Sequence, residues 1–175
     1  VDSGLFQGPA ANRRRNWKPL PFPARSVDAV VLTHAHIDHS ARIPCLVKNG
    51  FQGDIYCTAA TRDLCAAMLM DSAFIQEKDV EYVNRRRKKK GQRAFEPLYT
   101  KADAAKSMAQ FVGLSYNRRH RICPGVHLTL VDAGHMLGSA HVVLDIEEPP
   151  DAPPRRLVFS GDIGRPDIPI IRDPE

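Results

Sequence analysis

The chain has 175 residues, of which 43% are hydrophobic and 26% are charged, ordinary values for one globular domain with its own core. No run of 18 apolar residues is present, which excludes a conventional membrane-spanning helix, and no secretory or transit signal is evident. The net charge of +5 reflects basic residues clustered at 11–20, 85–93 and 117–121. Such clusters favour a polyanionic partner such as RNA or DNA, although a solvated surface explains charge alone equally well.

The four cysteines do not form a disulfide or zinc-binding pattern. Cys45, Cys57, Cys65 and Cys123 show no CxxC spacing and no dense framework. We expect them to be small buried residues rather than zinc ligands. We therefore expect a cytoplasmic protein in a reducing compartment, without membrane association.

The first half of the chain alternates between strands and helices. Residues 28–33 have a short buried-strand pattern, and residues 37–48 follow as a helix. Residues 54–57 are predicted to form a second strand. Either Thr58 or Thr61 then caps a helix that runs through residue 74.

The second half begins with helices and ends with strands. Residues 75–93 are predicted to form a charged, exposed helix, and residues 101–110 a short one. From residue 126 the pattern predicts strands at 126–131, 140–146 and 156–160, with a proline-rich surface turn at 147–154. Strands alternating with helices indicate a mixed α/β domain. The opening residues, VDSG, look like the end of a strand, so we expect a piece of a longer domain.

Four potential metal ligands lie within six positions of one another, in the segment THAHIDH. They are His34, His36, Asp38 and His39, and they directly follow the first predicted strand. Neutral imidazoles and carboxylates are common zinc ligands, and a tight turn after a strand can point alternate side chains inward. Packing alone does not explain four such residues together, so the segment predicts a metal site.

Two further potential ligands also follow predicted strands. His135 lies in AGHMLGSAH and Asp162 lies in SGD, and each has small neighbours. Glycine at such positions lets the backbone approach a metal or a phosphate closely. Each signal is weak by itself, but together with the first cluster they complete a pattern.

The combined motifs resemble those of the metallo-β-lactamase superfamily. VDSG, THAHIDH, AGHMLGS and SGD occur in the family's order and span the chain. VDSGLFQG, GHMLGSAH and EPLYTKADA are more similar to the β-CASP branch, specifically to bacterial relatives of the polyadenylation-factor endonuclease subunit. The resemblance implies a partial αββα sandwich over residues 1–175 that lacks its N-terminal strands and C-terminal part. It also implies a β-CASP cap domain after residue 175.

The resemblance assigns roles to seven residues. It implies that His34, His36 and His135 hold one zinc ion, that Asp38 and His39 hold a second, and that Asp162 bridges the two. It also implies that Asp2 steadies a ligand or the histidine loop. The family's seventh ligand, a late histidine, has no match here. His120 and His141 receive no role, and of these two His141 is expected to lie nearer the cleft.

These roles imply hydrolysis of a phosphodiester. Two Zn²⁺ ions, or Mn²⁺ in their place, would share a water whose pKa falls to about 7, so that hydroxide attacks phosphorus. Asp38 would orient this nucleophile or accept its proton, with Asp2 supporting the site. The expected substrate is RNA, or single-stranded DNA, cleaved by exo- or endonuclease action. Arg85, Arg86, Arg87, Lys88, Lys89 and Lys90 are the predicted nucleic-acid contacts.

Two alternatives remain open. The same ligands would serve a hydrolase of a small thioester, lactone or lactam, which THAHIDH cannot distinguish from a nuclease. A non-catalytic RNA-processing subunit is the second alternative, but all six ligand positions expected in this segment are present, which argues against it. Few aromatic residues interleave the basic stretches, so base stacking is not evident from the sequence. A homo-oligomer is compatible with the sequence.

Overall fold

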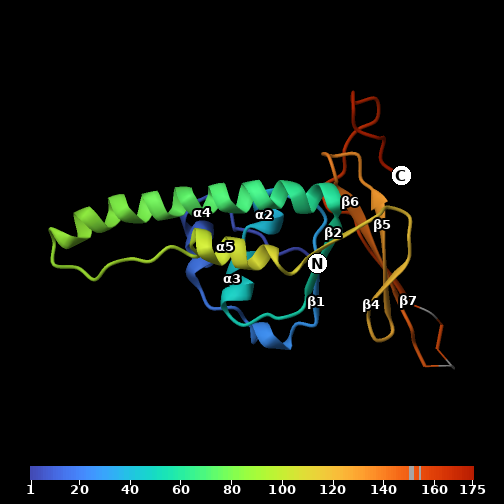
Figure 1. Ribbon diagram of the computed structural model, residues 1–175, viewed down its shortest axis with the longest axis horizontal. Helices are drawn as coiled ribbons and strands as arrows, with labels where there is room; N and C mark the ends of the chain where they lie inside the picture. The colour runs from blue at the N-terminus through green and yellow to red at the C-terminus, as the bar shows by residue number, and fades with distance from the viewer. Residues whose placement is uncertain (150–151, 154) are drawn as a thin grey trace.

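Two β-sheets lie against each other, and helices cover the outer face of the first sheet (Figure 1). The structure is a computed structural model that describes residues 1–149, 152–153 and 155–175. The strands are β1 (Ala29–Val31), β2 (Asp54–Thr58), β3 (Phe111–Leu114), β4 (His120–Cys123), β5 (Val126–Asp132), β6 (Ala140–Ile146) and β7 (Arg155–Phe159). The helices are α1 (Ala10–Arg13), η1 (Arg14–Trp17), η2 (Ala24–Ser26), α2 (Ile37–Ser40), α3 (Ile43–Lys48), α4 (Ala59–Lys88) and α5 (Lys101–Met108).

The first sheet is parallel and has the order β1-β2-β3. Parallel neighbours need a crossover connection, which α2 and α3 provide between β1 and β2, and α4 and α5 between β2 and β3. The helices bury one face of this sheet in a core that includes Leu32, Ile55, Leu69 and Tyr99. The segment after β1 therefore leaves a well-packed sheet, which fixes where its side chains point.

The second sheet is antiparallel and has the order β4-β5-β6-β7. Leu128, Leu130 and Val142 from this sheet pack with Val31 of β1 and with Tyr56 of β2. The two sheets therefore share a second, smaller core. Within the described residues the layers run helices, parallel sheet, antiparallel sheet, which confirms the predicted α/β class and partial αββα arrangement.

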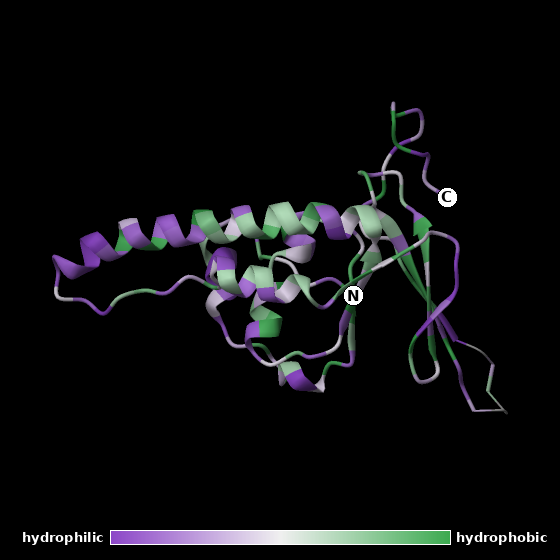
Figure 2. Cartoon of the chain, in the orientation of Figure 1, coloured by the Kyte–Doolittle hydropathy of each residue, from purple (hydrophilic) through white to green (hydrophobic). Residues whose placement is uncertain are grey.

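Helix α4 extends well beyond the body of the domain (Figure 1). Thr58 caps it by accepting a hydrogen bond from the Thr61 backbone N–H at 3.1 Å, which selects Thr58 from the two predicted caps. Its first half buries Cys65, Leu69 and Ala73 on one face. Its second half projects, and the projecting end is mostly hydrophilic (Figure 2). The prediction of two helices, ending at residue 74 and starting at 75, was wrong because no glycine or proline interrupts the segment.

The predicted helix over residues 37–48 is in fact two helices, α2 and α3. The backbone N–H of Arg42 donates to the Ser3 carbonyl at 2.8 Å instead of to a helical partner. Pro44, which lacks an N–H, lies in the first turn of α3. Proline tolerates a first turn but not a helix interior, so the chain begins a new helix there.

Several elements were not predicted from the sequence. They are the N-terminal helices α1, η1 and η2 and the strands β3 and β4, all of which are short. Part of the turn predicted at 147–154 lies outside the described residues. Among the residues that the structure describes, every helix is too short or too polar to cross a bilayer.

The cysteines are free thiols, and three of them, Cys45, Cys57 and Cys65, are buried. Burial raises the pKa of Cys57 and Cys65 to about 12. Protonated, enclosed thiols are poor metal ligands, because zinc binds the thiolate. These cysteines therefore belong to the hydrophobic core, as predicted.

Candidate metal centre

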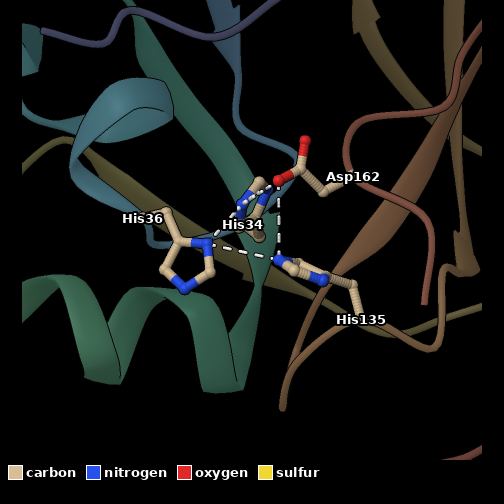
Figure 3. Close-up of side chains that lie close together, drawn as sticks. All are labelled: His34, His36, His135 and Asp162. Atoms are coloured by element: carbon tan, nitrogen blue, oxygen red, sulfur yellow. Dashed lines mark hydrogen bonds and ion pairs between the residues drawn. The ribbon is translucent and has the colours of Figure 1, made fainter. Parts of the chain in front are cut away.

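Four side chains from three separate segments converge on one point (Figure 3). His34 follows β1, His36 immediately precedes α2, His135 lies between β5 and β6, and Asp162 follows β7. Each offers one ligand atom, and these atoms all lie within 4.8 Å of one another. The two sheets together therefore assemble this group, because neither sheet supplies all four residues.

The ring nitrogens of the three histidines face each other. The Nδ1 of His36 lies 3.0 Å from the Nε2 of His34 and 3.2 Å from the Nε2 of His135. The Oδ2 of Asp162 lies 3.8 Å from the Nε2 of His34 and 3.6 Å from the Nε2 of His135. His34 is fully buried, whereas His36 and His135 are partly exposed and Asp162 is open to solvent, so the point of convergence is accessible from outside.

A hydrogen-bond chain through Thr33 fixes the tautomer of His34. The Thr33 hydroxyl donates to the Oδ2 of Asp2 at 2.9 Å, because an ionised carboxylate only accepts. The same hydroxyl lies 3.0 Å from the Nδ1 of His34, so it accepts the proton on that nitrogen. The lone pair of His34 is consequently on Nε2, the nitrogen that faces the cluster.

Asp2 fixes the tautomer of His39 in the same way. The Nδ1 of His39 lies 2.7 Å from the Oδ2 of Asp2 and donates to it. The Nε2 of His39 lies 3.4 Å from the Oδ1 of Asp162. Asp162 thus directs one oxygen toward His34 and His135 and the other toward His39. A divalent cation placed between this nitrogen and the carboxylate would be bound by both.

The electrostatic state of His34 suits a ligand. Burial, followed by the neighbouring histidines His39 and His36, lowers the pKa of His34 to about 4. The imidazole is therefore neutral at neutral pH, the form in which histidine binds metals. Converging imidazole nitrogens beside a carboxylate are a donor set that zinc prefers, so the residues present fit a divalent metal.

The N-terminal segment that carries Asp2 is hydrogen-bonded alongside residues 34–39, the histidine loop. The backbone N–H of Ser3 donates to the His39 carbonyl at 2.7 Å, and that of Leu5 donates to the Ile37 carbonyl at 2.9 Å. Any side chain at Gly4 would overlap the backbone carbonyl of Asp38. The glycine of VDSG is therefore needed for this close approach.

The loop that carries His135 is held by hydroxyl groups. The Ser139 hydroxyl accepts hydrogen bonds from the backbone N–H groups of His135 and Met136, at 3.1 and 3.2 Å. The hydroxyls of Thr58 and Thr61 donate to the Gly138 carbonyl at 2.7 and 2.8 Å. The N-terminal end of α4 therefore supports the turn that positions His135.

The other predicted site residues lie outside this group. Asp38 is exposed in α2, and the structure does not bring it into the set of four. His141 is directed to the neighbouring strand, with its Nδ1 2.7 Å from the Ser160 carbonyl, two residues before Asp162. The predicted nucleic-acid contacts, residues 85–90, lie at and just beyond the projecting end of α4. Thr33 and Ser139 were missed from the sequence, because hydroxyl residues carry no recognisable metal-site spacing.

A family model described as a beta-lactamase superfamily domain matches residues 2–171. The chain belongs to the metallo-β-lactamase superfamily. Metallo-β-lactamase structures also share the fold: a variant from Cronobacter sakazakii matches 97% of this chain and 54% of its own, with a TM-score of 0.53 and 18% identity. A subclass B3 metallo-β-lactamase with an active-site glutamic acid matches 96% of this chain and 56% of its own, with a TM-score of 0.50 and 17% identity.

Curated metallo-β-lactamase relatives have more similar sequences. Ribonuclease TTHA0252 of Thermus thermophilus is 33% identical over 174 residues, covering 99% of this chain and 34% of the relative. Transcription termination factor FttA of Methanosarcina mazei is 34% identical over 141 residues, covering 80% of this chain and 20% of the relative. These relatives are of the β-CASP type, which confirms the resemblance inferred from the motifs. The chain spans about a third of the length of the first relative and about a fifth of the second.

Proposed function

We propose that the full-length protein is a zinc-dependent hydrolase that cleaves phosphodiester bonds of RNA. One observation carries this proposal: ring nitrogens of His34, His36 and His135 converge beside Asp162, whose second oxygen faces His39. A cation among His34, His36 and His135 and a second cation beside His39 would each lie next to an oxygen of Asp162. A two-metal site of this kind suits hydrolysis of a phosphate ester.

The proposed ligands divide between two metal ions. His34, His36 and His135 would hold the first ion, His39 and Asp38 the second, and Asp162 would contact both. Asp2 would not touch either ion, but would hold His34, through Thr33, and His39 in the required tautomers. Zn²⁺ is the proposed ion, with Mn²⁺ as the alternative.

The remaining chemistry belongs to the protein side chains. Bound divalent metal lowers the pKa of water toward neutrality and offsets negative charge on phosphate oxygens. Asp38, exposed in the same short helix as His39, would orient the attacking water or accept its proton. The hydrogen bonds of Asp2 and Ser139 would hold the histidines in place, so that little reorganisation is needed during the reaction.

Two observations support RNA as the substrate. The relatives with the most similar sequences include a ribonuclease and a transcription termination factor. Five of the six basic residues at 85–90 are exposed, and Arg87 is partly buried. Within the described part of the chain, these six residues form no ion pair with an acidic side chain. Free cationic groups of this kind attract the phosphates of a nucleic acid.

The buried free thiols are compatible with a reducing compartment, and we extend the proposal to a cytoplasmic location.

The proposal is tested with the full-length protein, stripped of metal and then reloaded with Zn²⁺ or Mn²⁺. End-labelled RNA, DNA of the same sequence, a thioester and a β-lactam are supplied in parallel. We expect metal-dependent cleavage of RNA that is lost in His36→Ala and retained in His127→Ala, a histidine outside the cluster. Thioester or β-lactam turnover without RNA cleavage would overturn the ribonuclease proposal, and no turnover with any substrate would favour a non-catalytic subunit.

A further inference from the structure

Two basic stretches that are far apart in the sequence meet at a pair of exposed aromatic rings. Trp17 lies within the basic segment 13–18, and Phe95 follows the basic stretch 85–93. Their ring centroids lie 5.4 Å apart, with an angle of 42° between the ring planes. Trp17 is 48% exposed and Phe95 is 37% exposed, so both rings contact each other while still facing solvent.

Paired hydrogen bonds from asparagine side chains hold the segments of both rings. The Asn16 side chain accepts from the backbone N–H of Phe6 at 2.9 Å and donates to its carbonyl at 3.0 Å. The Asn84 side chain, on α4, likewise accepts from the backbone N–H of Phe95 at 2.7 Å and donates to its carbonyl at 2.8 Å. These pairs hold the backbone beside Trp17 and that of Phe95 in place, which favours a preorganised arrangement of the two exposed residues.

The backbone also connects this aromatic pair to the metal centre. Phe6 follows Leu5, whose N–H donates to the carbonyl of Ile37, the residue directly after His36. A cavity of about 340 Å³ lies along this connection and is lined by Phe6, Ile37 and Trp17, among others. A second cavity, of about 220 Å³, lies between Trp17, Phe95 and α4. Trp17 thus stands between the histidine loop and the projecting end of α4.

The two stretches that carry the rings are strongly basic. Eleven basic residues belong to the two stretches: Arg13, Arg14, Arg15, Lys18, Arg85, Arg86, Arg87, Lys88, Lys89, Lys90 and Arg93. None of them is ion-paired among the residues that the structure describes. Within the part of the chain that the structure describes, Asp79 is the only carboxylate residue that lines either of these two cavities. A surface with this charge favours a polyanionic partner over a cationic or purely apolar one.

We propose that Trp17 and Phe95 form a stacking platform for the bases of single-stranded RNA, flanked by cations that contact its phosphates. This inference rests on the proposed function for the identity of the polymer, and it adds the surface that binds the strand outside the metal centre. Aromatic side chains stack on any base, whereas the surrounding lysines and arginines follow the backbone. Stacking was not evident from the sequence, because the two rings come from segments nearly eighty positions apart and only the fold brings them together.

Binding is measured separately from cleavage, on the metal-free full-length protein. The probe is a fluorescently labelled, unstructured oligoribonucleotide of about 12 nucleotides, a length within the range that single-strand-binding domains cover. We expect Trp17→Ala and Phe95→Ala to weaken binding by about 10-fold or more, since each removes a stacked base. Trp17→Phe should retain most of the affinity. Phe74→Ala is the matched control, because Phe74 is an equally exposed aromatic residue on α4, 44% exposed, and it does not line the cavities beside Trp17.

A second probe isolates stacking from charge. An abasic strand of the same length keeps its phosphates but offers no base to stack. We expect wild type and Trp17→Ala to bind this strand with equal affinity, while they differ on the strand with bases. If Trp17→Ala weakens both strands equally, the ring does not stack on bases and the proposal fails.

The remaining outcomes are also decisive. Unchanged RNA affinity in Trp17→Ala and Phe95→Ala would overturn the platform, and a changed oligomeric state in light scattering would then identify the surface as a contact between protein copies. Loss of base-dependent binding in a protein that cleaves no RNA would support the platform while overturning the ribonuclease proposal. The two proposals can therefore fail independently.

Discussion

The metal centre and the projecting end of α4 differ in how their polar groups are held. At the centre, a chain of hydrogen bonds connects Asp2, Thr33, His34 and His39. Asp2 comes from a different segment of the chain than the other three residues. At the end of α4, a single helix carries consecutive cations, most of them exposed. The difference follows from what each region must do. Chemistry needs side chains fixed to a fraction of an ångström, whereas attraction of a polyanion depends mainly on the local density of charge.

This contrast predicts two kinds of response to substitution. Single changes at the metal centre should produce large losses, because each ligand is irreplaceable. Changes at the end of α4 should produce small, cumulative losses that depend on salt.

The largest effect is expected from His36→Ala. Its ring nitrogen contacts both His34 and His135, so its loss leaves the first proposed metal ion with an incomplete set of ligands. Metal ions supply several kcal/mol of transition-state stabilisation, and each 1.36 kcal/mol is tenfold in rate. We expect kcat/KM for RNA to fall by about 1,000-fold or more, with little change in the thermal unfolding midpoint because His36 is partly exposed. Near wild-type turnover would show that the ligand assignment is wrong.

Thr33→Val tests the hydrogen-bond chain behind the centre. Valine keeps the shape of threonine but removes the hydroxyl between Asp2 and His34, so the tautomer of His34 is no longer fixed. Groups that orient a metal ligand typically contribute about 10- to 100-fold to metal affinity, and we expect a loss of that size in a zinc titration. Thr33→Ser, which keeps the hydroxyl, should retain the affinity. Equal losses in both variants would mean that packing rather than the hydroxyl is responsible.

A third test neutralises the exposed cations at the end of α4. Arg87 is left in place because its guanidinium donates to the Arg93 carbonyl at 2.7 Å and so holds the loop between α4 and α5. The other five residues at 85–90 are replaced by glutamine. We expect RNA affinity to fall by about 10-fold near 0.1 M salt, and the slope of log K against log salt to decrease by about 0.7 for each lost phosphate contact. An unchanged slope would identify the stretch as a solvated surface.

The smallest effect is expected outside both regions, at the cap of α5. Asp103 and Thr100 form a capping box, and Lys48 lies 3.7 Å from the Asp103 carboxylate. Burial raises the pKa of Asp103, but the hydrogen bonds from Thr100 and the charge of Lys48 outweigh it, so the pKa lies below its ordinary value. A carboxylate with a lowered pKa stabilises the fold above the unfolded-state pKa, and this contribution is lost as pH falls through the folded-state pKa, below about 4.

We therefore expect Asp103→Ala to cost about 1 kcal/mol at pH 7 and less at acid pH, measured by denaturant unfolding. Asp63→Ala is the control, because its carboxylate is exposed and pairs only with a neighbouring arginine. RNA cleavage per folded molecule should not change in either variant. A cost for Asp103→Ala that does not diminish as pH falls would contradict the capping argument.

The sequence predicted the α/β class, and it also predicted most of the longer elements. Local patterns explain this success, since the buried strand before His34 and the capped helix after Thr58 are each encoded by consecutive residues. The break between α2 and α3 was missed, because it depends on a contact between Arg42 and the distant Ser3. The short strands β3 and β4 were also missed, since their pairing partners stabilise them more than their own sequences do.

The candidate site was partly predictable for a similar reason. Histidines and aspartates after strands are visible as motifs, but the hydroxyl groups that orient them are not. Thr33 connects Asp2 to His34 only because the N-terminal segment returns alongside the histidine loop. Likewise, Trp17 and Phe95 carry no signal until the fold places them together. Contacts between segments far apart in the chain account for both omissions.

A crystal structure of the full-length protein grown with excess zinc, with anomalous diffraction recorded at the zinc edge, tests the account most directly. We predict two anomalous peaks, one among His34, His36 and His135 and one beside His39, both in contact with Asp162. Diffraction data that show these side chains ordered, with no anomalous density between them, would contradict the account.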